Sequence, residues 1–142
     1  MNERRVVLDT NVMVSGLRSR LGTAFRLLDL IGKGGLEIAL SVPLVLEYED
    51  ALLRATSLSK PEVGRLLSYW CSVGHLQKVF FLWRPLLRDP KDDMVLELAV
   101  ASQSRHVVTF NQRDFAGAER FGIEALPPRS FLELLGEKPW QP

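Results

Sequence analysis

Acidic side chains stand at separate places along the chain, where an α/β protein would gather them into one site. They are Asp9, Glu47, the adjacent pair Asp92 and Asp93, and Asp114. Carboxylate oxygens are the ligands that Mg²⁺ and Mn²⁺ prefer, and these ions also bind substrate phosphate oxygens. Without a cation, clustered carboxylates repel one another strongly. The set therefore predicts a divalent-metal site suited to phosphodiester chemistry.

The expected position of Asp9 follows from the residues before it. Residues 6–8 are β-branched or aliphatic, which is typical of a strand covered on both faces of a parallel sheet. Ligands of open α/β sheets bind outside the carboxyl ends of the strands. An acid that directly follows such a strand is therefore expected to face the site, although it could also serve only to cap a turn.

Strand and helix patterns alternate along the chain. Strands are expected at 4–8, 36–40, 78–83, 106–110 and 123–126, and helices at 21–31, 43–54, 61–72, 93–104 and 130–135. The stretch 84–91, with two prolines, is expected to be a loop. This alternation predicts a three-layer α/β sandwich with a mostly parallel central sheet of about five strands. At 142 residues the chain fits a single domain over residues 1–142.

Three of the expected helices have recognisable starts. Ser41 followed by Pro43 is typical of a cap and first turn, and Ser59 with Glu62 matches a capping box. Asp92 or Asp93 is expected to cap the helix that follows them. The helix over 61–72 also carries more apolar residues than one buried stripe needs, which predicts a homodimer.

Composition narrows the class of protein. The hydrophobic and charged fractions, 46% and 25%, are those of a globular domain. One cysteine, Cys71, rules out an internal disulfide framework and suits a reducing compartment. No signal peptide pattern and no apolar run of membrane-spanning length occurs, so we expect a cytoplasmic protein with no membrane partner.

The net charge of +1 hides a local imbalance. Committing four of the 17 acidic side chains to metal would leave the 18 basic ones in clear excess. The first 34 residues hold twice as many basic as acidic groups, a surplus that could bind a phosphate backbone. The basic groups are Arg4, Arg5, Arg18, Arg20, Arg26 and Lys33. Solvated helix faces would explain the same residues.

Other chemistries fit the sequence less well. The glycine-rich stretch 32–35 lacks the spacing and the Ser or Thr of a phosphate-binding loop. His75 and His106 are too isolated for a zinc site, and no serine-hydrolase elbow is present. A phosphatase of the haloacid dehalogenase type would have a second Asp two residues after Asp9, where this chain has Asn11.

Four segments taken together resemble the motifs of the PIN-domain nucleases. Residues 7–12, VLDTNV, resemble the first motif, and residues 41–48, SVPLVLEY, resemble the second. Residues 89–93, DPKDD, with the apolar helix after them, resemble the third, and residues 108–115, VTFNQRDF, resemble the fourth. Each motif alone is weak, but their order and spacing span residues 5–135. The likeness is closest to the branch of toxins from bacterial toxin–antitoxin pairs.

The resemblance implies a ribonuclease that binds Mg²⁺ or Mn²⁺ through four acids. These acids are Asp9, Glu47, Asp93 and Asp114, with Asp92 kept as the alternative to Asp93. Asn11, Thr109 and Asn111 would orient ligands, water or substrate. The fourth motif of the family commonly carries further acids or a hydroxyl where this chain has Phe110 and Asn111. One ion or two therefore remains open.

The resemblance also implies RNA as substrate, a cognate antitoxin protein as partner and a homodimer. Two alternatives stay open. One is a PIN-like module that binds RNA or a partner without cleaving, and the other is a housekeeping nuclease instead of a toxin. All of the matching acids are present, which favours an enzyme over the non-catalytic module.

Overall fold

The computed structural model describes residues 2–79, 87 and 89–136. The strands are β1 (Asn2–Leu8), β2 (Glu37–Leu40), β3 (His75–Leu76), β4 (Ser104–Val108) and β5 (Glu124–Leu126). The helices are α1 (Thr10–Arg18), α2 (Thr23–Asp29), α3 (Val42–Ala55), α4 (Lys60–Val73), α5 (Pro90–Ala101) and α6 (Pro128–Leu134). Two 3₁₀ turns, η1 (Gln112–Phe115) and η2 (Ala118–Phe121), separate β4 from β5.

The strands form a five-stranded sheet in the order β3-β2-β1-β4-β5, and every neighbouring pair is parallel. Strand β1 lies in the centre, between β2 and β4, and its residues 6–8 are fully buried. The predicted three-layer architecture and the predicted strand number are confirmed. Because all strands run the same way, Asp9 and Thr109 both emerge at the same edge of the sheet.

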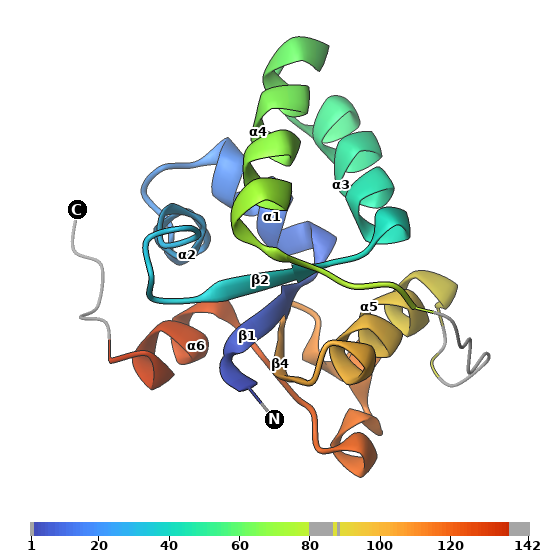
Figure 1. Ribbon diagram of the computed structural model, residues 1–142. Helices are drawn as coiled ribbons and strands as arrows, with labels where there is room; N and C mark the ends of the chain where they lie inside the picture. Colours follow the sequence, from blue (N-terminus) through green and yellow to red (C-terminus); the bar gives the residue numbers. More distant parts are fainter. Residues whose placement is uncertain (1, 80–86, 88, 137–142) are drawn as a thin grey trace.

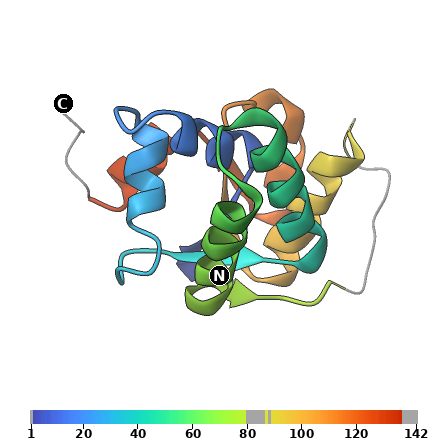
Figure 2. The ribbon, with the colours of Figure 1, turned by 90° about the horizontal axis from the view of Figure 1, so that it is seen from above.

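Helices cover both faces of the sheet. In Figure 1, α1 to α4 lie above β2, whereas α6 and α5 lie lower, on opposite sides of β1; α6 contacts α2, and α5 contacts β1 and β4. Figure 2, seen from above, shows α3 and α4 side by side with α2 and α5 at opposite ends. The core is one continuous cluster that joins aliphatic residues of the sheet to the inner faces of these helices. No helix within residues 2–79 and 89–136 is long and apolar enough to cross a membrane.

Local capping signals fixed two of the helix starts as predicted. The Ser41 hydroxyl accepts a hydrogen bond from the Leu44 amide, and Pro43 occupies the first turn of α3. Ser59 and Glu62 form the predicted capping box at the start of α4. These signals involve residues only three apart, so they act regardless of the rest of the fold.

The structure corrects several boundaries. Helix α1 was not predicted; it begins directly after Asp9 and packs closely on α2, where a Cβ on Gly16 would overlap the Leu28 side chain. The cap of α5 is Asp89, neither Asp92 nor Asp93, because the Asp89 carboxylate accepts from the Lys91 amide at 2.9 Å. The helix therefore starts earlier than predicted.

Two strands also differ from the prediction, and the structure shows how the helix expected to form the dimer surface is packed. Strand β3 lies before the expected range 78–83, of which 80–83 are outside the described residues, and β4 ends at Val108 instead of 110. On α4, Val63, Leu67 and Trp70 are buried within the monomer. Tyr69, by contrast, is 47% exposed, so part of the apolar surface of this helix lies outside the core.

Candidate metal and nuclease site

Asp9 is held in place at the carboxyl end of the central strand. Its backbone amide donates to the Val108 carbonyl oxygen at 2.9 Å, which ties it to β4. Its Oδ1 accepts from the Thr10 amide at 2.9 Å, and its Oδ2 accepts from Thr109 Oγ1 at 2.7 Å. Asp9 is thus the cap of α1 and, at the same time, an acid oriented by two donors. Asp9 therefore has both of the roles considered from the sequence, that of a cap and that of an acid facing the site.

Burial raises the pKa of Asp9 above its usual value. The hydrogen bonds from Thr109 and Thr10 favour the ionised form and offset part of that rise, whereas the charges of Asp114 and Asp89 add to it. The carboxylate is therefore costly to keep ionised in the folded protein without a nearby cation.

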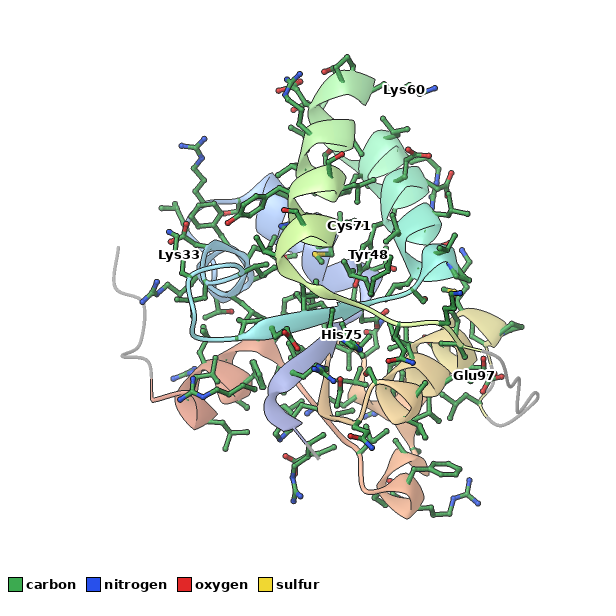
Figure 3. The ribbon with its side chains drawn as sticks, in the orientation of Figure 1. Lys33, Tyr48, Lys60, Cys71, His75 and Glu97 are labelled. Carbon is green, nitrogen blue, oxygen red and sulfur yellow. The ribbon has the colours of Figure 1, made fainter. Side chains whose placement is uncertain are left out.

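Tyr48 supports the strand end from within the core. It is fully buried, and its hydroxyl donates to the carbonyl oxygen of Leu8, the residue just before Asp9. Figure 3 shows Tyr48 reaching from α3 toward the sheet. Burial, with a contribution from the Asp9 charge, raises the pKa of Tyr48 well above its usual range, so the hydroxyl stays protonated and donating.

Asp92 is the acid of the adjacent pair that is coupled to the site. Burial, followed by the charges of Asp9, Asp114 and Asp89, raises the pKa of Asp92 to about 7, and Asp93 adds a smaller effect. Since such repulsion requires proximity, these carboxylates share one region of the molecule. The third and fourth motifs thus meet the first motif at this edge of the sheet.

Asp93 has a different environment from the one we expected. Its side chain is only 2% exposed, and its Oδ1 accepts from the Leu87 amide at 2.8 Å. One of its oxygens is therefore used to hold the segment that precedes α5. Asp93 was the expected ligand, with Asp92 as its alternative; here Asp93 holds the backbone before α5, and Asp92 is the acid whose pKa is raised by burial and, after burial, by Asp9 and Asp114.

Glu47 lies on α3, along the side of a groove of about 550 Å³ between α1 and α3. Thr10, Asn11 and Arg18 also line this groove. The Glu47 carboxylate is 3.2 Å from Lys91 Nζ at the start of α5. The second motif is thus linked to the third by an ion pair and shares a groove with the first.

The polar residues expected to support the acids are also close to them. Asn11 Oδ1 lies 3.5 Å from the Phe110 amide nitrogen, and the Asn111 amide donates to Thr109 Oγ1 at 3.0 Å. Thr109 therefore accepts from Asn111 while it donates to Asp9, so its hydroxyl proton is directed at the carboxylate. This chain of contacts joins α1 to the segment after β4.

The acids near Asp9 are of the type that binds a divalent cation, but their arrangement does not form a complete set of ligands. Within the described part of the chain, no three His, Cys, Asp or Glu side chains lie close enough together to hold an ion. However, the raised pKa values of Asp9 and Asp92 arise from burial and, in part, from repulsion by neighbouring carboxylates such as Asp114, which a cation would relieve. Carboxylate oxygens are hard ligands, which Mg²⁺ and Mn²⁺ prefer.

Three residues near the site were not singled out from the sequence. They are Tyr48, Lys91 and Asp89. Tyr48 follows Glu47 directly in an apolar helix, which was an available signal for a buried hydroxyl near the site. Nothing in the sequence shows that Lys91 reaches α3, since that contact depends on how α5 packs.

Comparisons with known proteins agree with this arrangement. The family described as PIN domain matches residues 5–113, which include the first three motifs and most of the fourth. No curated protein is similar enough in sequence to count as a match. A structurally similar chain occurs in the crystal structure of VapBC2 from Rickettsia felis bound to a DNA fragment from their promoter. The TM-score is 0.57 at 18% identity, over 85% of this chain and 96% of that one.

The similarity to the VapBC2 chain shows a shared fold. At 18% identity it does not show that the two chains share the same site residues. The family match rests on the sequence itself and covers well over half of it. It includes Asp9, Glu47 and Asp92, which reach the same edge of the sheet or the groove beside it. This chain belongs to the PIN domain family.

Proposed function

We propose that the protein is a divalent-metal-dependent endoribonuclease that hydrolyses RNA phosphodiester bonds. The observation that carries the proposal is the environment of Asp9. This acid is oriented by Thr109 and Thr10 at the end of the central strand and is electrostatically coupled to Asp92 and Asp114. PIN domains are generally nucleases of this kind, which supports the assignment.

The residues that would hold one or two Mg²⁺ or Mn²⁺ ions are Asp9, Asp92 and Asp114, with Glu47 completing the set. Asp93 remains the alternative to Asp92. A bound ion would lower the pKa of a water molecule and stabilise charge on the scissile phosphate. The protein supplies the orientation: the Thr109 hydroxyl donates to one oxygen of Asp9, and the Thr10 backbone amide donates to the other.

In the proposed reaction, a water molecule is the nucleophile. The water oxygen forms a bond to phosphorus, the P–O3′ bond breaks, and the leaving oxygen takes up a proton from solvent. Glu47 or Asp114 would accept the proton that the water loses. We therefore expect products with a 5′-phosphate and a 3′-hydroxyl.

Cleavage of mixed RNA with Mg²⁺ or Mn²⁺, with and without a chelator, tests the proposal. We expect cleavage by the parent protein and its loss in Asp9→Asn, with Glu133→Gln on α6 as a matched control outside the site. RNA binding without cleavage would instead indicate a non-catalytic PIN-like module. A parent protein that neither binds nor cleaves RNA would contradict the proposal.

We further propose that the protein is the toxin of a toxin–antitoxin pair, acts in the cytoplasm and is inhibited by a cognate antitoxin. The fold shared with a chain of the VapBC2 structure supports this assignment over a housekeeping nuclease. A cluster of acids without its cation would attract an Arg or Lys from a partner segment. An adjacent small gene for a DNA-binding protein would separate the toxin from the housekeeping nuclease.

A homodimer remains part of the proposal, and α3 offers an apolar surface for it in addition to the one on α4. Val42, Leu46 and Leu53 are exposed on α3, where their spacing places them on one stripe of the helix. An apolar stripe of this kind suits contact with a second copy. Light scattering that shows a monomer at high micromolar concentration would remove the dimer.

A further inference from the structure

A second pocket lies near the amino ends of the strands, whereas Asp9 follows the carboxyl end of β1. Its volume is about 340 Å³, and residues of β1, β4, β5 and α6 line it. Arg105 lines it from β4, and Thr109, which holds Asp9, follows four residues later. Four residues of extended strand span about 13 Å. The pocket is therefore separate from the proposed metal site and from the groove between α1 and α3.

One wall of this pocket is apolar and packed against the core. Phe131 is fully buried, and His106 is only 6% exposed. Their rings meet edge to face, with centroids 5.5 Å apart and an angle of 62° between the ring planes. Leu134, which is 60% exposed, and Leu135 extend the wall along α6. An apolar ligand group would therefore meet a surface whose inner part is held rigid by the core.

Charged side chains form the exposed part of the lining. They are Arg4, Arg105 and Glu124. Arg105 makes no hydrogen bond or ion pair with any residue within 2–79, 87 and 89–136. Oε1 of Glu124 lies 3.8 Å from Nε2 of His106. Two guanidinium groups against one carboxylate give the pocket a positive balance, which favours an anion as ligand.

Arg4 comes to the pocket from an irregular part of the sheet. Asn2 pairs with Ser104 and Val6 with His106, so the pairing advances four residues along β1 but only two along β4. Irregularities of this kind redirect side chains and are common next to functional sites. Nη1 of Arg4 donates to the Gly35 carbonyl oxygen at 2.9 Å, which anchors this guanidinium beside the pocket.

We propose that this pocket binds a small organic anion, a molecule with an apolar body and one carboxylate or phosphate group. The body lies against Phe131 and Leu134, and the charged group pairs with Arg105. Glu124 disfavours ligands with several negative charges. The volume is at the lower end of the range for ligand pockets, about 300–1,000 Å³, which restricts the ligand to a small molecule. This inference does not depend on the proposed nuclease function.

Fluorescence titration with anilinonaphthalene sulfonate, an aromatic anion whose emission rises in apolar surroundings, tests the site. Arg105→Gln should weaken binding about 5- to 10-fold, because it removes the charge partner of the probe. Glu124→Gln should strengthen binding up to about fivefold, because it removes a repulsive charge. Leu134→Gln should weaken binding, since it removes apolar contact. Benzoate should displace the probe better than inorganic phosphate, which has no apolar body.

Two variants serve as matched controls. Arg129→Gln, on α6, removes a cation that is paired with Glu133 and does not line the pocket. Leu46→Gln removes an exposed apolar side chain on α3. Both should bind the probe like the parent, and thermal melting confirms that each variant is folded. As a measurement without substitutions, benzoate should shift the backbone amide NMR signals of residues 105, 106, 124 and 131.

The outcomes decide the inference independently of the nuclease proposal. Binding that neither Arg105→Gln nor Glu124→Gln changes would show that the probe lies elsewhere and would overturn the inference. Loss of binding in Leu46→Gln would assign the probe to α3, with the same consequence. A folded parent that binds neither the probe nor benzoate also overturns it. None of these results affects the proposed nuclease, which RNA cleavage tests separately.

Discussion

Lys91 Nζ at the start of α5 lies 3.2 Å from Oε1 of Glu47 on α3. In this ion pair, the Lys91 ammonium group contacts one of the acids proposed to bind metal. An ammonium group on this carboxylate competes with a divalent ion, and it also reduces the repulsion within the metal-free site.

Removing this ammonium should strengthen metal binding. Lys91→Met frees the Glu47 carboxylate, and we expect Mn²⁺ to bind up to about fivefold more tightly, since a partly exposed ion pair contributes at most about 1 kcal/mol. Calorimetric titration measures the change. Lys60→Met, on a side chain that points outward at the far end of α4 in Figure 3, is the control. Equal affinity in Lys91→Met and the parent would show that Glu47 is not a ligand.

The adjacent acids Asp92 and Asp93 should respond differently to the same substitution. Asp92→Asn should weaken Mn²⁺ binding at least tenfold, because Asp92 is coupled to Asp9 and Asp114. Asp93→Asn should change affinity little but lower the free energy of unfolding by about 1 kcal/mol, since an amide oxygen accepts from Leu87 less strongly than a carboxylate does. The reverse pattern would restore Asp93 as the ligand.

The raised pKa of Asp92 predicts how the stability of the metal-free protein depends on pH. The folded protein holds this proton up to about pH 7, whereas the unfolded chain loses it near 3.8. Between these values the folded state binds more protons, so its stability falls as pH rises and levels off above 7. The raised pKa of Asp9 acts in the same direction, and the charges of Asp114, Asp89 and Asp93 oppose ionisation of Asp92.

Melting temperatures between pH 5 and 8 test this expectation. Asp92→Asn should flatten the decline, and saturating Mn²⁺ should remove most of it, because the ion stabilises the ionised carboxylates. Glu133→Gln, on α6, should follow the parent curve. A metal-free parent that gains stability across the same range would refute the assignment.

Thr109 should affect the site without contacting substrate. Thr109→Val keeps the shape of the side chain but removes the hydroxyl that holds Asp9, so we expect metal affinity or kcat to fall about 10- to 100-fold. Thr109→Ser should retain most of the activity. Thr56→Val, which removes a hydroxyl bonded to the Leu52 carbonyl at the end of α3, should not lower activity. Full activity in Thr109→Val would show that Asp9 needs no orientation.

An inhibitory partner should compete with metal. A basic peptide that occupies the acidic crevice loses its favourable charge contacts once a divalent ion is bound. Inhibition should therefore weaken as Mg²⁺ rises, and footprinting should map to Asp9, Glu47, Asp92 and Asp114. Inhibition that does not depend on Mg²⁺, with protection far from these residues, would indicate a distant partner site.

The sequence predicted the elements whose signals are local. Ser41 and Ser59 capped the helices as expected because each bonds an amide only three residues away. Helix α1 was missed, since Asp9 was considered as the cap of a turn but not of a helix, and the buried face of α1 is short. Among Asp89, Asp92 and Asp93, any one could cap α5 on local grounds. The choice depends on the Leu87 amide and on repulsion from Asp9, which only the folded chain establishes.

The hydrogen bond between Thr109 and Asp9 joins residues 100 positions apart. During translation, Thr109 therefore leaves the ribosome 100 residues after Asp9. Until then β1 lacks β4 beside it, and the central strand cannot complete its pairing. A nascent or truncated chain that ends before residue 109 therefore has no assembled site. If the protein is the ribonuclease proposed above, the messenger and ribosome that produce it are protected from it until residue 109 has left the ribosome.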